Sequence, residues 1–90
     1  MAVRLIGYDL NKPGKDYKPL YDGIKKVGST WWHYLDSTWL VVTDKSPSDI
    51  RDELKQYIDN NDHLMVVALS GAWATQNLSK ECNDWLHQHM

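Results

Sequence analysis

The sequence contains a single cysteine, Cys82, among its 90 residues. One cysteine cannot form an internal disulfide, and this scarcity suits a reducing cytoplasm. The longest apolar run, at 64–69, has six residues, whereas a membrane-spanning helix needs roughly 18. The N-terminus has no signal-peptide pattern, since Arg4 and Asp9 interrupt its apolar stretch. We therefore expect a cytoplasmic protein that does not enter a membrane.

The chain also lacks a large excess of charge of either sign. Ten Lys and Arg residues against twelve Asp and Glu residues give a formal net charge of −2. The chain as a whole is therefore no general polyanion binder. Lysines are nevertheless frequent between positions 12 and 26. Among them, Lys12, Lys15 and Lys18 are candidates for phosphate contacts, with an ordinary solvated surface as the alternative.

Several signatures of catalytic and metal sites are absent. The sequence has no glycine-rich phosphate loop, no Gly-x-Ser-x-Gly motif and no zincin motif. Cys82, His87 and His89 lie close together, but their spacing lacks the paired pattern of a zinc site. We interpret His33, between apolar residues of a strand, as a packing residue rather than a base.

The residue pattern predicts one α+β domain over residues 1–90. Apolar periodicity and turn residues separate strands from helices, and Ser46, Pro47 and Asp49 form a clear helix start. The expected strands are 3–9, 30–35, 38–43 and 63–70, and the expected helices are 17–27, 46–58 and 78–88. This β-α-β-β-α-β order with an appended C-terminal helix predicts a ferredoxin-like sandwich.

A hairpin turn at Asp36-Ser37 allows the faces of the sheet to be assigned. Successive strand residues point to opposite faces, so pairing Leu35 with Thr38 places Trp32, Tyr34 and Trp39 together. We expect the charged Arg4 to mark the face without helices. The predicted interface is therefore an open aromatic surface that consists of Arg4, Tyr8, Trp32, Tyr34 and Trp39. Such a patch favours a homodimer contact, with base stacking by a single-stranded nucleic acid as the alternative.

The segments YDLNKPGKDY, WWHYLDSTWLV and NDHLMVVALSG resemble those of SinR-like proteins. These proteins are small relatives of VapD and of the second CRISPR-associated protein. The resemblance covers about residues 3–86 and implies a ferredoxin-like fold, a homodimer and a link to phage defence or mobile-element biology. In the nuclease members, an aspartate at the end of the first strand binds a divalent metal, and that role maps onto Asp9. The helix expected at 78–88 departs from the family pattern, because relatives often place an exchanged strand there.

Two interpretations of Asp9 follow. As a metal ligand and catalytic residue, it would hold Mg²⁺ near a two-fold axis, because Mg²⁺ often needs only one or two protein carboxylates. As a turn residue, it would accept hydrogen bonds from backbone amides near Asn11. The pattern favours the turn residue, since the chain shows neither a second acid nor a base beside it.

The sequence therefore favours a small homodimeric binding protein over an enzyme. Its partner would be a second protein, a nucleic acid or a nucleotide-like ligand, and no cofactor is expected. The alternative is a weak metal-dependent ribonuclease that uses Asp9 and Mg²⁺.

Overall fold

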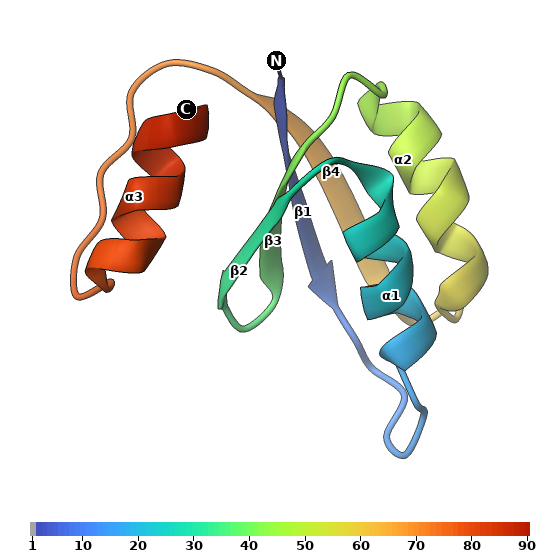
Figure 1. Ribbon diagram of the computed structural model, residues 1–90. Helices are drawn as coiled ribbons and strands as arrows, with labels where there is room; N and C mark the ends of the chain where they lie inside the picture. Colours follow the sequence, from blue (N-terminus) through green and yellow to red (C-terminus); the bar gives the residue numbers. More distant parts are fainter. Residues whose placement is uncertain (1) are drawn as a thin grey trace.

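The computed structural model describes residues 2–90 and contains four strands and three α-helices within that range (Figure 1). The predicted α+β class and the order of the elements are confirmed. The elements are β1 (Val3–Asp9), α1 (Lys18–Val27), β2 (Trp31–Leu35), β3 (Thr38–Val42), α2 (Pro47–Leu54), a short 3₁₀ turn (Lys55–Tyr57), β4 (His63–Leu69) and α3 (Lys80–His89). No helix in residues 2–90 is long and apolar enough to cross a membrane.

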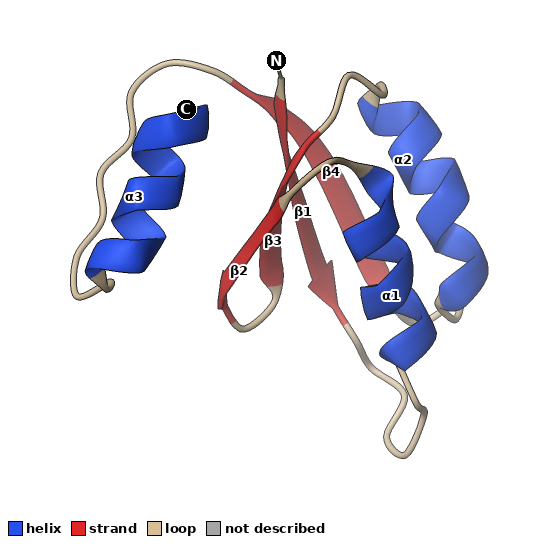
Figure 2. Ribbon diagram, in the orientation of Figure 1, coloured by secondary structure: helices blue, strands red, loops and turns tan. Residues whose placement is uncertain are grey.

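The four strands form one antiparallel sheet in the order β2-β3-β1-β4 (Figure 2). Helices α1 and α2 lie on one face of this sheet, and α3 lies on the other (Figure 1). Strands β1 and β3 are central, while β2 and β4 are the two edges. The two faces are therefore covered by elements from different parts of the chain.

Local chemistry explains where the helices begin and end. The Ser46 hydroxyl accepts a hydrogen bond from the Asp49 amide at 3.1 Å, so the predicted N-cap of α2 is confirmed. Helix α1 ends before Gly28, as expected, but the glycine has an extended backbone. A Cβ at position 28 would collide with the Val42 carbonyl. Glycine is required there because the chain passes against β3.

The face of the sheet that contacts α1 and α2, hereafter the helix-pair face, carries the larger core. Its buried side chains come from β1, β3 and both helices: Ile6, Tyr8, Leu20, Ile24, Val27, Trp39, Val41, Ile50 and Leu54. Four of the helix residues in this core are almost completely inaccessible to solvent. Each such side chain contributes about 1.5–3 kcal/mol by its burial, so this layer holds the fold together.

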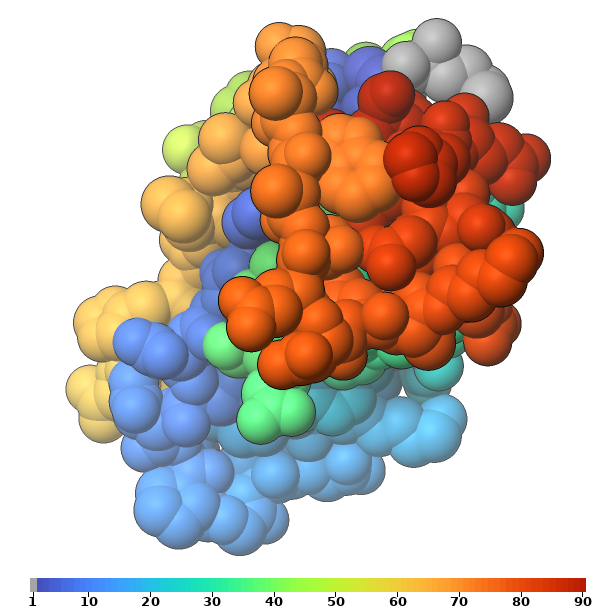
Figure 3. All heavy atoms as spheres, turned by 90° about the vertical axis from the view of Figure 1, so that its left-hand side faces the viewer, coloured from blue at the N-terminus to red at the C-terminus, as the bar shows by residue number. Residues whose placement is uncertain are grey.

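The opposite face, hereafter the α3 face, carries a smaller core formed by Val3, Trp32, Leu40, Val42, Cys82 and Leu86. Figure 3 shows α3 and the segment before it over one end of this face, with residues of β1 and of the β2–β3 hairpin visible beyond them. Helix α3 begins at Lys80, two residues later than expected, because the Ser79 hydroxyl caps it. The appended helix therefore covers only part of the face.

The predicted aromatic face is wrong. Leu35 pairs with Thr38 as expected, but Trp32 pairs with Leu40, because β2 contains an irregularity between Trp32 and Leu35. An extra residue in one strand reverses the facing of every residue beyond it. Trp32 therefore lies on the α3 face, while Trp39 lies on the helix-pair face.

Arg4 also lies on the opposite face of the sheet from the one predicted. It shares the helix-pair face with Ile6 and Tyr8, yet its guanidinium remains at the rim and donates from Nε to the Lys45 carbonyl at 3.0 Å. A long charged side chain at the end of a strand can reach solvent from either face. Its charge therefore did not identify an open surface.

Candidate functional site

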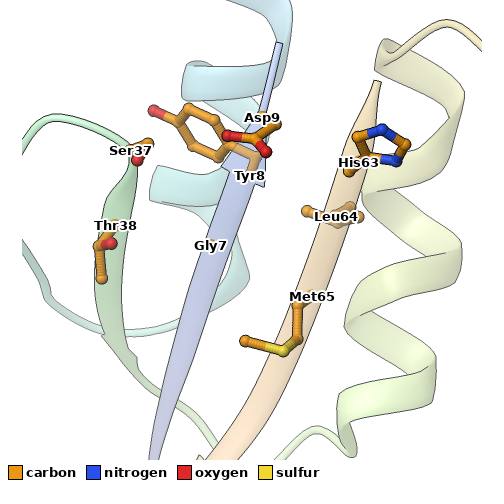
Figure 4. Close-up of a pocket in the computed structure, with 8 residues that line it drawn as sticks. All are labelled: Gly7, Tyr8, Asp9, Ser37, Thr38, His63, Leu64 and Met65. Atoms are coloured by element: carbon orange, nitrogen blue, oxygen red, sulfur yellow. The ribbon is translucent and has the colours of Figure 1, made fainter. Parts of the chain in front are cut away.

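The end of the α3 face that α3 leaves uncovered contains a shallow depression of about 320 Å³, here called the Asp9 hollow (Figure 4). Strands β1 and β4 and the hairpin supply its lining: Gly7, Tyr8, Asp9, Ser37, Thr38, His63, Leu64 and Met65. Gly7 has no side chain to fill the centre of the hollow, and Met65 is 60% exposed beside it. The hollow therefore combines apolar surface with two ionisable groups at one end.

Those two groups are Asp9 and His63, which occupy opposite positions on neighbouring strands. Figure 4 shows them at the same end of β1 and β4. Both side chains are exposed, and Asp9 forms no side-chain hydrogen bond or ion pair within residues 2–90. No pattern in the sequence marks His63 as a site residue, because only the strand register places it beside Asp9.

The prediction that Asp9 caps the following loop is wrong. The Asn11 amide donates instead to Asp62 Oδ1 at 2.6 Å, from a position 51 residues away. Asp62 also accepts from the Tyr17 hydroxyl at 2.9 Å and from the Asp59 amide at 2.9 Å. Asp62 therefore joins the β1–α1 loop to the α2–β4 loop, and it is the one charged residue buried within residues 2–90.

The environment of Asp62 favours its charged form. Burial alone would raise the pKa of the carboxyl, but hydrogen bonds from two backbone amides and a phenol oppose that effect. Together with the charge of Lys15, they lower the pKa below its ordinary value of 3.8. The same arrangement, through burial and the hydrogen bond to Asp62, raises the pKa of Tyr17. This cluster stabilises the loops rather than forming an open binding site.

Three of the aromatic residues predicted for the interface are buried. Trp39 donates from Nε1 to the Tyr8 hydroxyl at 3.0 Å, and the Trp32 indole donates to the Cys82 carbonyl at 3.2 Å. Burial raises the pKa of the Tyr8 phenol. Tyr34, by contrast, is 45% exposed. The predicted stacking platform is therefore not an open surface, since its largest rings belong to the two cores.

Trp31 is an exposed aromatic residue outside the predicted interface. Its ring is 42% exposed, and Lys25 Nζ lies 5.1 Å from the ring centroid. Behind it, His33 stacks on Trp39 at 3.8 Å, which confirms that His33 is a packing residue. The irregularity in β2 decided this exposure, and no pattern in the sequence distinguishes Trp31 from Trp32.

The lysines proposed to contact phosphates lie beside carboxylates. Lys12 and Lys15 approach Asp59 at 3.7 and 3.1 Å, and Lys18 pairs with Asp22 at 2.8 Å. The Asp22 carboxylate raises the pKa of Lys18. In contrast, Lys25 and Lys26 form no ion pair within residues 2–90. Positive charge that is not held in an ion pair therefore lies at the end of α1, where Lys25 approaches Trp31, rather than in the β1–α1 loop.

The donor set of the Asp9 hollow fits a metal ion only in part. The described residues contain no group of three or more His, Cys, Asp or Glu side chains suited to a metal. Asp9 and His63 supply one carboxylate and one imidazole, and an imidazole suits Zn²⁺ better than Mg²⁺. Asp9 is the one carboxylate among the residues that line the hollow, so Mg²⁺ there would take its other ligands from water or from a second copy.

No protein-family model matches the sequence, and no solved structure is significantly similar to the fold.

Proposed function

We propose that the protein is a homodimeric, non-catalytic binding protein, and that the exposed edge of β4 joins the two copies. The proposal rests on a difference between the two edges of the sheet. Strand β4 has seven residues with regular pairing to β1, and none of its side chains is fully buried. It carries no lysine and no proline. A long, flat, apolar edge is a template for pairing with another strand.

The opposite edge lacks these properties. Strand β2 has five residues, and its pairing with β3 is interrupted between Trp32 and Leu35. A bulge twists an edge and opposes pairing with another chain. Antiparallel pairing of β4 with a second β4 about a two-fold axis would form one continuous eight-stranded sheet. The two Asp9 hollows would then open on the same face.

The oligomeric state tests this proposal. Light scattering should give a particle of about twice the 10.5 kDa chain mass. Met65→Lys, within β4 itself, should shift the protein towards monomer, because lysine on an edge strand opposes pairing. Tyr34→Lys provides the matched control, since it places the same charge on an exposed residue of β2. A 10.5 kDa particle for the unmodified protein would overturn the dimer.

The surface around Trp31 supports a nucleic acid or nucleotide-like ligand. Single-strand binders combine exposed rings with cations, and one base stacked on an aromatic ring contributes about 1–3 kcal/mol. Trp31 and Lys25 supply this combination, and Lys26 adds a second positive charge in the last turn of α1. Polarisation of a labelled oligonucleotide should show salt-dependent binding that Trp31→Ala weakens. Lys80→Gln removes a charge from α3, on the opposite face of the sheet from Trp31, and should leave binding unchanged. Equal loss of binding in both variants would contradict this ligand site.

A metal-dependent nuclease remains the second candidate, because Asp9 and His63 lie side by side in the strand register. The test is cleavage of RNA and DNA with Mg²⁺, Mn²⁺ or EDTA. Cleavage lost in both Asp9→Asn and His63→Gln, but retained in Asp44→Asn, would support the nuclease over a binding protein. No cleavage by the unmodified protein would leave the binding role.

The proposed fold type is ferredoxin-like. The strand order β2-β3-β1-β4, the antiparallel neighbours and the two crossover helices on one face support it. The relation to SinR-like and VapD-like proteins, and the link to phage defence or mobile elements, are supported by the resemblance of the quoted segments.

A further inference from the structure

A second concavity lies beneath helix α3 and is distinct in character from the Asp9 hollow. It has a volume of about 370 Å³ and extends between the α3 face of the sheet, helix α3 and the segment 70–79. Its lining comes from all three parts: Leu5, Trp32, Leu35, Thr38, Leu40, Leu69, Trp73, Ala74, Thr75, Gln76, Leu78, Leu86 and Met90. We call it the α3 cavity; Thr38 is its only residue in common with the Asp9 hollow.

The attachment of α3 explains why this space stays open. Two tryptophan indoles anchor the helix near β2: Trp32 donates to the Cys82 carbonyl, and Trp85 donates to the Thr30 hydroxyl, each at 3.2 Å. The segment 70–79 must return from β4, at the far edge of the sheet, to reach this position (Figure 1). It bends at Gly71 and Asn77, which both have positive φ. The helix and the segment therefore form two walls over the sheet.

The lining determines what chemistry the cavity can accept. None of its side chains is charged, and most are leucine or tryptophan. The Thr75 hydroxyl already donates to Asn83 at 2.6 Å. The Thr38 hydroxyl and the Gln76 amide have no side-chain hydrogen bond within residues 2–90 and can meet one polar group of a ligand. A charged ligand would lose its hydration without a compensating partner, which is costly.

We propose that the α3 cavity is a binding site for a neutral, largely apolar small molecule that contains an aromatic ring. Ligand sites are mostly apolar concavities of about 300–1,000 Å³ with a few polar groups, and this cavity falls in that range. A dry apolar cavity of about 150 Å³ already binds benzene. The Trp73 ring, which is only partly buried, provides a flat surface for an aromatic ligand. Leu69, at the end of β4, is the one residue of the proposed dimer edge in its lining, and Asp9 is not part of it.

Titration with the uncharged probe N-phenyl-1-naphthylamine tests the site directly. Calorimetry should give one probe per chain, and probe fluorescence should rise on binding. The carboxylate 1-naphthoate should compete at least about tenfold more weakly than its neutral relative 1-naphthamide, a difference of about 1.4 kcal/mol. Equal competition by the two compounds, or no binding of the probe, would overturn the proposal.

Variants on the rim locate the binding. Leu35→Glu and Ala74→Glu each place a charge at the cavity on exposed positions, and each should weaken probe affinity at least about tenfold. Ala72→Glu is the matched control, because Ala72 is exposed on the same segment but does not line the cavity. Circular dichroism establishes that all three variants are folded. Equal affinity in all three variants would place the probe elsewhere and contradict the site.

Discussion

Helices α1 and α2 seal one face of the sheet, whereas α3 leaves the other face half open. On the helix-pair face, side chains from both helices interdigitate with those of β1 and β3, and the helix residues at its centre are inaccessible. On the α3 face, a single helix is attached through a long segment and covers a cavity that opens to solvent. The first arrangement provides stability, and the second leaves apolar surface that can bind other molecules.

This difference has a physical origin in chain connectivity. Helices α1 and α2 each connect two strands of the sheet, so both of their ends are held close to it. Within residues 2–90, helix α3 connects no two strands and is joined to the sheet through the segment that follows β4. A helix that does not connect two strands can stand away from the sheet, because fewer contacts oppose the conformational entropy of its tether.

Matched leucine substitutions should give the largest measurable difference in packing between the two faces of the sheet. Leu20→Ala in α1 should lower the free energy of unfolding by about 4 kcal/mol, because it leaves a void in close-packed surroundings. Leu86→Ala in α3 should cost only about 2 kcal/mol, since that side chain already borders a cavity. Urea denaturation measures both values. Equal losses would show that the two faces are equally well packed.

The buried carboxylate at the edge of the helix-pair layer provides the next test. Asp62→Asn should lower Tm by several degrees at neutral pH, since the amide cannot accept the same set of hydrogen bonds. Folding lowers the pKa of Asp62 below its ordinary value of 3.8. The ionised carboxylate therefore contributes fully to the stability of the fold at pH values above that ordinary pKa. This stabilisation is lost as the pH falls through the lower pKa that Asp62 has in the folded protein.

Thermal melts between neutral pH and pH 2 check this dependence. The difference in Tm between the unmodified protein and Asp62→Asn should shrink as the pH falls below about 4, the ordinary pKa range of an aspartate. Asp44→Asn, an exposed acid with no side-chain hydrogen bond within residues 2–90, serves as the control. A constant difference across the pH range would contradict the role assigned to Asp62.

Two buried tryptophans allow a smaller, more local comparison. Trp32→Phe removes the hydrogen bond from the sheet to α3, while Trp39→Phe removes the one to Tyr8 within the helix-pair core. The lost hydrogen bond should cost about 1 kcal/mol in each case. Hydrogen exchange should distinguish the variants: Trp32→Phe accelerates exchange in α3 alone, whereas Trp39→Phe affects the whole sheet. The same exchange pattern in both would contradict independent attachment of α3.

The smallest effect is expected for Asp9. Asp9→Asn should change the free energy of unfolding by less than about 0.5 kcal/mol, because the exposed carboxylate has no hydrogen-bond partner within residues 2–90. Chemical denaturation beside Asp62→Asn measures the contrast between the two acids. A large loss of stability in Asp9→Asn would mean that Asp9 has a structural role, which the geometry assigns to Asp62 instead.

The sequence by itself determined the local structure. Alternating apolar residues specified the strands, and Ser46 with Pro47 specified the start of α2, since these signals act within a few residues. The hairpin turn at Asp36-Ser37 was also predicted correctly, including the pairing of Leu35 with Thr38. The β-α-β-β-α-β order followed from these local elements, and the structure has that order.

Only the tertiary structure decided the faces and the sites. One irregularity in β2 leaves Trp31 exposed and Trp32 buried, although the two residues are chemically identical neighbours. Asp62 reached Asn11 across 51 residues, and strand register placed His63 beside Asp9. These outcomes depend on contacts between distant segments, and local propensity carries no information about such contacts. The position of α3, and with it the cavity beneath it, was decided in the same way.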